Sequence, residues 1–232
     1  MKKLSNPKGV VIYEGISLLD NITPVVVIAT FESKNEKTGN MVQTWILRSD
    51  MPPHEAVKRG DDKAICGDCK YASGNGCYVT TYRAPLSIYK AYKRGNYPSV
   101  GVLGASGMVQ DRKVRIGAYG DPACVPFFVW SGLLKGHTSG HTGYTHQWKK
   151  YPQLKKYVMA SVDNAKEALE AIKLGFRVFA VHKGTSYMNA LTVTCPASKE
   201  AGKKSSCITC TACNGVGDGE RSKRAHVEIA MH

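Results

Sequence analysis

The chain has 232 residues, a hydrophobic share of 43% and a formal net charge of +14. This length suits one large domain, the composition supports a buried core, and a charged share of 22% argues against wholesale disorder. No apolar run approaches the roughly 18 residues that span a bilayer. Glu14 and Gly15 interrupt the apolar stretch near the N-terminus, so we expect no secretory signal. We therefore expect a cytoplasmic protein without a membrane partner.

The positive charge predicts nucleic acid as a partner, because a large positive field attracts phosphate backbones. Basic residues are spread along the chain, in "KAYKRG", "QWKKYPQLKKY", "KEAGKK" and "ERSKRAH". A solvated, soluble surface would carry the same residues. No recognition motif accompanies them, so the charge predicts no sequence specificity and no oligomeric state.

The first third of the chain is expected to be β-rich. Residues 8–15, 24–32 and 42–48 have the β-branched and aromatic content of strands, and turn residues separate them. A loop is expected over 49–82, where Gly, Asp, Lys and Pro are frequent. A helix should follow over 84–97, with proline in its first turn and glycine near its end.

Strands and helices then alternate to the end of the chain. The best helix is expected over 164–175, with Asn164 as its N-cap and Gly175 as its stop. Further strands are expected at 113–121, 142–148, 157–163, 176–182, 190–196 and 226–232, with helical segments at 122–136 and 151–157. This alternation predicts a parallel sheet with helical crossovers. The expected fold is a single α/β domain over 1–232, a partial or distorted TIM-like barrel. It carries a cysteine-rich loop (49–82) and a cysteine-rich C-terminal module (195–232).

Most of the expected strands end in a polar or reactive residue. Since the carboxyl ends of parallel strands carry the active site in such folds, we expect a functional face there. Polar residues also occur wherever a strand simply ends, which is the competing interpretation. Asp121 and Asp163 are the predicted catalytic residues. The predicted substrate-binding residues are Tyr144, His146 and His182. The aromatic residues of "YTHQW" suit stacking on a base, and equally a core position.

Seven of the eight cysteines fall into two clusters. Structural disulfides are not expected in a reducing compartment, whereas a metal centre needs several thiolates close together. The second cluster, Cys195 with Cys207, Cys210 and Cys213, has four ligands and a dense C-x2-C-x2-C core. It predicts zinc or a 4Fe–4S cluster, and repeated C-x2-C steps favour iron–sulfur. A redox dithiol pair or plain buried cysteines are the alternatives. The lone Cys124 is expected in the core.

The first cluster is Cys66, Cys69 and Cys77, with only three thiols. Three cysteines would leave one position open for chemistry on an iron cluster or a zinc ion. A further residue such as His54 would close the site, and a single centre shared by both clusters is another alternative. His137 and His141 could also hold a metal, although surface histidines explain them as well. The glycines of "GASG" (104–107) give only a weak phosphate-loop signal.

The order of motifs resembles a family of uncharacterised proteins from phages and other mobile elements. The resemblance covers roughly residues 66–232. It is carried by "CGDCKYASGNGCYV", "GAYGDP", "YTHQW", "ASVDN", "CPAS", "CITCTACNG" and a last strand that ends in histidine. The cysteine motifs are specific and the shorter ones are not. This family implies no activity, but it implies the host cytoplasm as the location.

Two wider resemblances imply chemistry. Radical S-adenosylmethionine enzymes hold a 4Fe–4S cluster with three cysteines on a partial barrel, and many carry an auxiliary four-cysteine cluster. Their spacing is C-x3-C-x2-C, whereas this chain has C-x2-C-x7-C. Guanine transglycosylases are barrels with aspartates at strand ends and a late zinc site. That resemblance implies Asp121 and Asp163 as nucleophile and acid/base, with His226 or His232 near the metal. The local motifs of that family are absent.

We therefore expect a metal-centre phage enzyme that acts on nucleic acid or nucleotides, by radical-type or transglycosylase-type base modification. Its cofactors would be 4Fe–4S clusters or zinc, with S-adenosylmethionine for a radical reaction. The metal ligands would be Cys66, Cys69, Cys77, Cys195, Cys207, Cys210, Cys213 and His232. The alternative is a non-catalytic phage protein that metal ions staple together and that binds DNA or a host protein.

Overall fold

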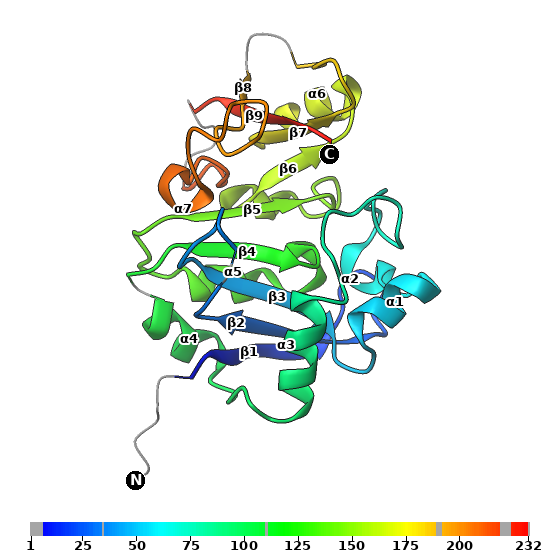
Figure 1. The fold of residues 1–232 in the computed structure, drawn as a ribbon, viewed down its shortest axis with the longest axis vertical. Coiled ribbons are helices and arrows are strands. Elements are labelled where there is room, and N and C mark those ends of the chain that lie inside the picture. Colours follow the sequence, from blue (N-terminus) through cyan, green and yellow to red (C-terminus); the bar gives the residue numbers. More distant parts are fainter. Residues whose placement is uncertain (1–6, 34, 110, 189–191, 219–223, 232) are drawn as a thin grey trace.

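A computed structural model describes residues 7–33, 35–109, 111–188, 192–218 and 224–231. In these ranges the strands form one mixed sheet with the order β1-β2-β3-β4-β5-β6-β7-β9-β8 (Figure 1). The strands are β1 (Gly9–Ile16), β2 (Pro24–Thr30), β3 (Val42–Arg48), β4 (Val114–Tyr119), β5 (His141–Thr145), β6 (Met159–Val162), β7 (Val178–His182), β8 (Thr192–Thr194) and β9 (His226–Ala230).

The α/β class is confirmed, and the barrel is not. Strands β1, β2 and β3 form an antiparallel meander, and every later neighbour pair is parallel. In the described part of the chain, β1 and β8 stand at the two ends of a linear order, so the sheet is open there. The last strand, β9, lies between β7 and β8.

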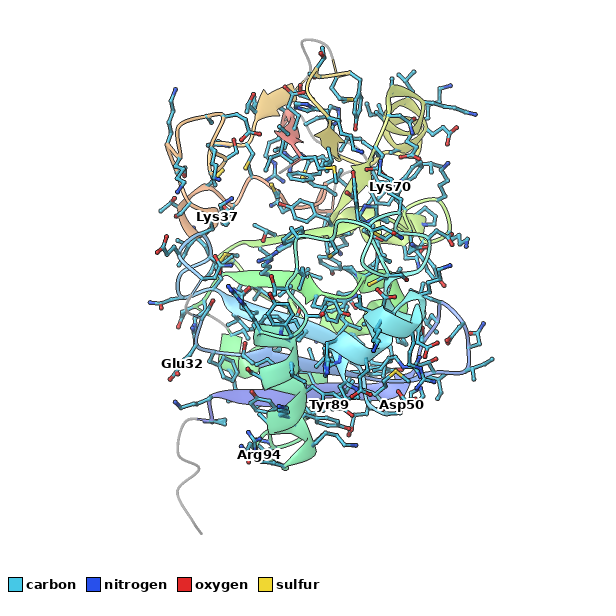
Figure 2. All side chains as sticks on the ribbon, turned by 45° about the vertical axis from the view of Figure 1, so that its right-hand side comes forward. Glu32, Lys37, Asp50, Lys70, Tyr89 and Arg94 are labelled. Atoms are coloured by element: carbon cyan, nitrogen blue, oxygen red, sulfur yellow. The ribbon has the colours of Figure 1, made fainter. Side chains whose placement is uncertain are left out.

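The helices cover both faces of the sheet. Helices α4 and α5 pack together on one face, while α3 crosses in front of β1–β3 on the other (Figures 1 and 2). The expected loop at 49–82 contains two short helices, and "GASG" lies inside α4 rather than in an open phosphate loop. The helical segments are α1 (Pro53–Arg59), α2 (Lys63–Cys66), α3 (Ala84–Lys93), α4 (Gly101–Val109), η1 (Pro122–Cys124), α5 (Phe127–Leu133), η2 (Pro152–Lys156), α6 (Ala165–Lys173) and α7 (Cys207–Cys210).

The local sequence explains where helices α1 and α6 begin and end. Helix α1 has proline at its first position and ends at Gly60, whose φ of 75° suits glycine. The predicted caps of α6 are confirmed: the side chain of Asn164 accepts a hydrogen bond from Glu167 N, and Gly175 follows the helix with a φ of 86°.

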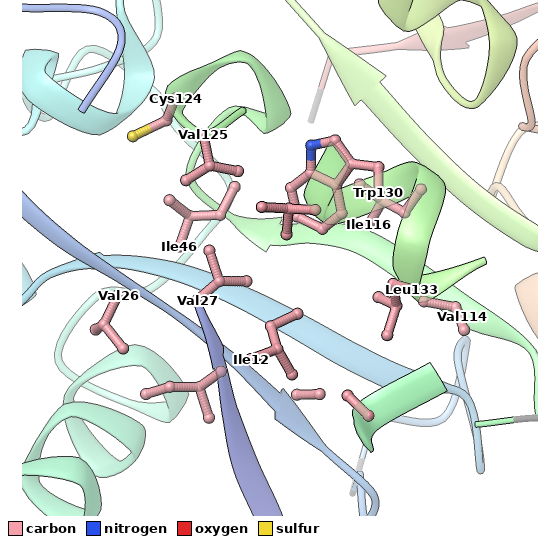
Figure 3. Packing of buried hydrophobic residues seen from close by; sticks show 14 of the residues in the cluster. Ile12, Val26, Val27, Ile46, Val114, Ile116, Cys124, Val125, Trp130 and Leu133 are labelled. Atoms are coloured by element: carbon pink, nitrogen blue, oxygen red, sulfur yellow. The ribbon is translucent and has the colours of Figure 1, made fainter. Parts of the chain in front are cut away.

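The main core lies between the sheet and α5 (Figure 3). Trp130 is fully buried against Ile46 and Ile116, and its Nε1 donates a hydrogen bond to Pro122 O at 2.9 Å. A second cluster, which includes Trp148 and Phe176, packs α6 against β6 and β7. The helices that the structure describes are all too short or too polar to cross a membrane.

His141, at the start of β5, should make stability depend on pH. Burial lowers its pKa to about 4, and its Nε2 lies 2.9 Å from Tyr157 O, to which it can donate. The unfolded chain binds a proton near pH 6.5 and the folded chain does not, so the free energy of unfolding should fall from pH 6.5 to 4 by about 2 to 3 kcal/mol.

Urea unfolding at several pH values tests this expectation. His141→Gln keeps a donor for Tyr157 O but does not titrate, so its stability should change less between pH 6.5 and 4. Equal pH dependence in the two proteins would rule His141 out as the cause.

Candidate metal centres

The first thiol group, Cys66, Cys69 and Cys77, lies at the carboxyl ends of the parallel strands (Figure 1). All eight cysteines of the chain are free thiols. The three sulfurs are close enough to act on one another. Burial, followed by the charges of Asp62, Cys69 and Cys77, raises the pKa of Cys66 well above its usual value. The three thiols of the first group therefore lie near one another and are reduced.

Hydrogen bonds to its backbone carbonyls fasten this cysteine loop to the residues that follow β4 and β5. Asp121 N donates to Ile65 O at 2.7 Å, and Gln147 Nε2 donates to Cys66 O at 3.2 Å. Gly67 has a φ of 59°, and a Cβ there would come within 2.5 Å of the Gln147 amide. A larger side chain at this position would strain the backbone and displace the Gln147 amide that binds Cys66 O.

Backbone amides point at two sulfurs of the first group. Burial raises the pKa of Cys69 to about 11, while hydrogen bonds from the amides of Tyr71 and Ala72 oppose this shift. Cys77 accepts a hydrogen bond from Val79 N in the same way. Such N–H donors stabilise a thiolate, the form of cysteine that binds metal.

The second thiol group consists of Cys195, Cys207, Cys210 and Cys213, at the amino ends of β4 and β5 (Figure 1). Gly143 N in β5 donates to Cys213 O at 2.9 Å. Burial raises the pKa of Cys213 to about 12, a hydrogen bond from Tyr144 lowers it, and the charges of the other three thiols raise it further. The module folds back so that all four sulfurs interact.

Cations surround the second thiol group. Arg177 is 3% exposed and donates to Ala212 O, Asn214 O and Ala225 O at 2.6 to 2.7 Å. No carboxylate in the described ranges forms an ion pair with Arg177. Burial lowers the pKa of Arg177, and the charge of Cys213 raises it.

Two more cations, Arg115 and Lys37, act on this group. Burial raises the pKa of Cys207, and the positive charges of these two residues lower it. A buried cation is costly without a negative partner. Four thiolates around a divalent ion would provide one, because their total charge is negative. The residues of the second group therefore fit a thiolate metal centre.

The sulfurs do not yet form a coordination shell. Within the described ranges, no three His, Cys, Asp or Glu side chains are arranged so that they could hold a metal ion as they stand. The predicted ligand His232 lies outside the described residues.

Asp121 is buried beyond β4, and its oxygens are already occupied. Oδ1 accepts hydrogen bonds from Ala123 N at 2.9 Å and from the Thr145 hydroxyl at 2.7 Å, and Oδ2 accepts one from His146 N at 2.8 Å. Burial raises the pKa of Asp121 and these hydrogen bonds lower it. The geometry gives Asp121 a positioning role, and its catalytic role stays a prediction.

Asp163, after β6, contacts the loop of the first thiol group. Its Oδ1 lies 3.0 Å from the Tyr71 hydroxyl and 3.1 Å from Lys70 Nζ, and its side chain is 10% exposed. Lys70 and Tyr71 were missed in the sequence. Their place directly after Cys69 was the available signal. Figure 2 shows Lys37 and Lys70 toward opposite ends of the strands.

The other predicted residues do not all gather at one site. Tyr144 packs against Phe179 with ring centroids 4.3 Å apart and the rings tilted by 41°, and its hydroxyl interacts with Cys213 of the second thiol group. His182 ends β7, and its buried Nδ1 has no hydrogen-bond partner among the residues that the structure describes. The Nε2 atoms of His137 and His141 lie within hydrogen-bond distance of backbone carbonyls, those of Gly140 and Tyr157. These two ring nitrogens are therefore engaged by the backbone rather than by a thiol.

The fold and its thiols define an α/β protein with a largely parallel sheet. One group of reduced cysteines lies at the carboxyl ends of the strands and the other at the amino ends. Comparisons with protein-family models, with curated proteins and with solved structures find no match for the chain.

Proposed function

We propose that this protein is a metal-centre enzyme of a phage or other mobile element that modifies bases in nucleic acid or nucleotides. The observation that carries the proposal is that seven free cysteines lie in two groups whose thiols act on one another. The second group lies beside the buried Arg177, which forms no ion pair with a carboxylate among the described residues. The second group would hold a structural ion or cluster. The first group lies next to polar residues at the strand ends, where chemistry is expected.

The ligands would come from the cysteines of each group. A bound zinc ion would supply a Lewis acid, and a 4Fe–4S cluster would supply electrons and, with an open iron, a place for S-adenosylmethionine. The protein's own contribution is Asp163, which would act as general acid/base. Lys70 and Tyr71 hold its carboxylate in position.

A nucleic-acid substrate is supported by charge and by exposed aromatic rings. The net charge is +14, and Tyr78 and Tyr82 are 73% and 65% exposed. Tyr78 accepts a hydrogen bond from Arg115 at 2.7 Å, so one end of its ring is fixed while the rest is open. An anchored aromatic ring beside cations suits stacking on a base.

The first experiment is an anaerobic purification with elemental analysis and an absorption spectrum. Broad absorbance near 400 nm would indicate iron–sulfur, and a colourless protein with stoichiometric metal would indicate zinc. Incubation with DNA and RNA, followed by mass spectrometry of the nucleosides, then searches for a modified base. Protein that binds no metal would contradict the proposal.

Asp163→Asn should reduce the rate of base modification by roughly 100- to 10,000-fold, as expected for a general acid/base. The matched control is Asp68→Asn, which removes an exposed carboxylate of the same loop whose partner is Lys150 at 2.8 Å. Both variants should keep wild-type metal content and DNA affinity. Equal activities of the two variants would exclude Asp163 from catalysis.

A metal-stapled binding protein is the second candidate, and the hydrogen bonds of Asp121 favour it. A carboxylate whose oxygens are all engaged by its own chain serves structure. This candidate predicts DNA or host-protein binding without turnover. Its DNA affinity would fall steeply with salt and would not respond to Asp163→Asn.

A further inference from the structure

We propose that His146 is the fourth ligand of the first thiol group, so that Cys66, Cys69, Cys77 and His146 together hold one tetrahedral zinc ion. The inference rests on the proposed function in one respect, namely that the first thiol group binds metal. It changes the role of His146, which the sequence suggested as a substrate contact.

The distance between Cys69 Sγ and His146 Nε2 is close to that of two ligands on one ion. Cys69 Sγ lies 3.8 Å from His146 Nε2. In a tetrahedral zinc site with bonds of about 2.3 Å to sulfur and about 2.0 Å to nitrogen, the two atoms are about 3.5 Å apart. A shift of a few tenths of an ångström would therefore place both atoms in one coordination shell.

The fold holds His146 at this position from both sides. His146 follows β5, and its backbone N–H donates to Asp121 Oδ2 at 2.8 Å. The next residue, Gln147, donates from Nε2 to Cys66 O at 3.2 Å. The residue before it, Thr145, also binds Asp121. The strand end and the cysteine loop are thus joined through residues on either side of His146, as expected for a ligand fixed by its neighbours.

Other candidates for the fourth ligand are engaged elsewhere. His54 lies on α1 with its side chain 42% exposed and its Nε2 3.9 Å from Glu55. Both oxygens of Asp62 bind Ser73, at 2.7 Å to its amide and 2.7 Å to its hydroxyl. Asp163 binds Lys70 and Tyr71. His146 is the imidazole that contacts a sulfur of the group.

A Cys3His set occupies all four positions of a zinc ion. Closed zinc sites are structural, whereas catalytic sites keep one position open. The first group would then fix the loop that carries Lys70 and Tyr71 over Asp163. The chemistry would belong to these side chains, and S-adenosylmethionine would have no open iron.

Cobalt substitution tests the ligand set on the full-length protein. Co²⁺ replaces zinc, and its thiolate charge-transfer absorption grows with the number of Co–S bonds. The wild type should bind two Co²⁺ ions with seven thiolates. His146→Cys should keep both ions and raise the charge-transfer absorption by roughly one seventh, because it adds one thiolate.

His146→Ala should weaken one of the two ions by more than roughly 100-fold in competition with a chelator, since even the outer partners of metal ligands cost 10- to 100-fold. It should also change the ligand-field bands of that ion alone. His54→Ala is the matched control and should leave both affinities and the spectrum unchanged.

Three outcomes overturn the inference. If His146→Ala keeps both ions at wild-type affinity, or His146→Cys adds no absorption, His146 is not a ligand, although the proposed metal centres stand. If His54→Ala weakens an ion instead, His54 closes the site. A wild type without bound metal refutes the proposed function itself and the inference with it.

Discussion

Replacing Cys213 with serine is expected to remove one metal ion per chain and to lower the free energy of unfolding by about 3 to 5 kcal/mol or more. The sulfur of Cys213 interacts with the other three thiols of the second group and with Tyr144. Without the ion, Arg177 keeps its charge in a buried position, and no described carboxylate forms an ion pair with it. Elemental analysis and urea unfolding of the same preparation measure both effects.

Cys124→Ala provides the matched control. Cys124 is fully buried, and its sulfur lies 3.4 Å from the Ser17 hydroxyl and 3.6 Å from Ala64 O, so it is not a member of the second thiol group. Its replacement should cost about 1 kcal/mol and leave the metal content unchanged. If both variants keep their metal and lose similar stability, the second group is merely a cluster of buried thiols.

Replacing Arg177 with methionine is expected to destabilise the metal-loaded protein by about 3 to 5 kcal/mol, because the buried thiolate centre loses its counter-charge. Three backbone carbonyls around the module also lose their donors. In metal-free protein the same substitution should cost about 1 to 2 kcal/mol less, since there it also removes an uncompensated buried charge.

Unfolding of wild type and variant, each with and without metal, completes a thermodynamic cycle. Arg177→Lys keeps the charge but loses the planar guanidinium. Its free energy of unfolding should therefore lie between those of the wild type and the methionine variant. A cost of Arg177→Met that does not depend on metal would show that the arginine serves only its hydrogen bonds.

The local part of the fold was predictable from the sequence. The strands of the first third and the caps of α6 follow from residue type and spacing. The order of the strands in the sheet was not predictable. Parallel strands are joined by crossovers, and the length of a crossover does not determine which strands become neighbours. Strand β9 inserts between β7 and β8, and no pattern within its five residues indicates this.

At the candidate site, the sequence indicated how the thiols are grouped, while the roles of the site residues in metal binding and catalysis stay predictions. The spacing of the cysteines indicated two groups, and the thiols do converge. Sequence could not show that Asp121 accepts hydrogen bonds from Thr145 and His146, or that His146 rather than His54 contacts Cys69. These contacts join residues 24 to 77 positions apart, and only the three-dimensional arrangement of the strands brings them together.

The position of β9 sets the order in which the molecule can be completed. In the described ranges β8 pairs with β9 alone, and Cys195 N donates to Glu228 O at 2.8 Å. Before β9 has formed, β8 therefore has no strand partner in these ranges. Cys195, which directly follows β8, is then not fixed beside Cys207, Cys210 and Cys213. Assembly of the second thiol group thus depends on a strand that follows all four of its cysteines in the chain.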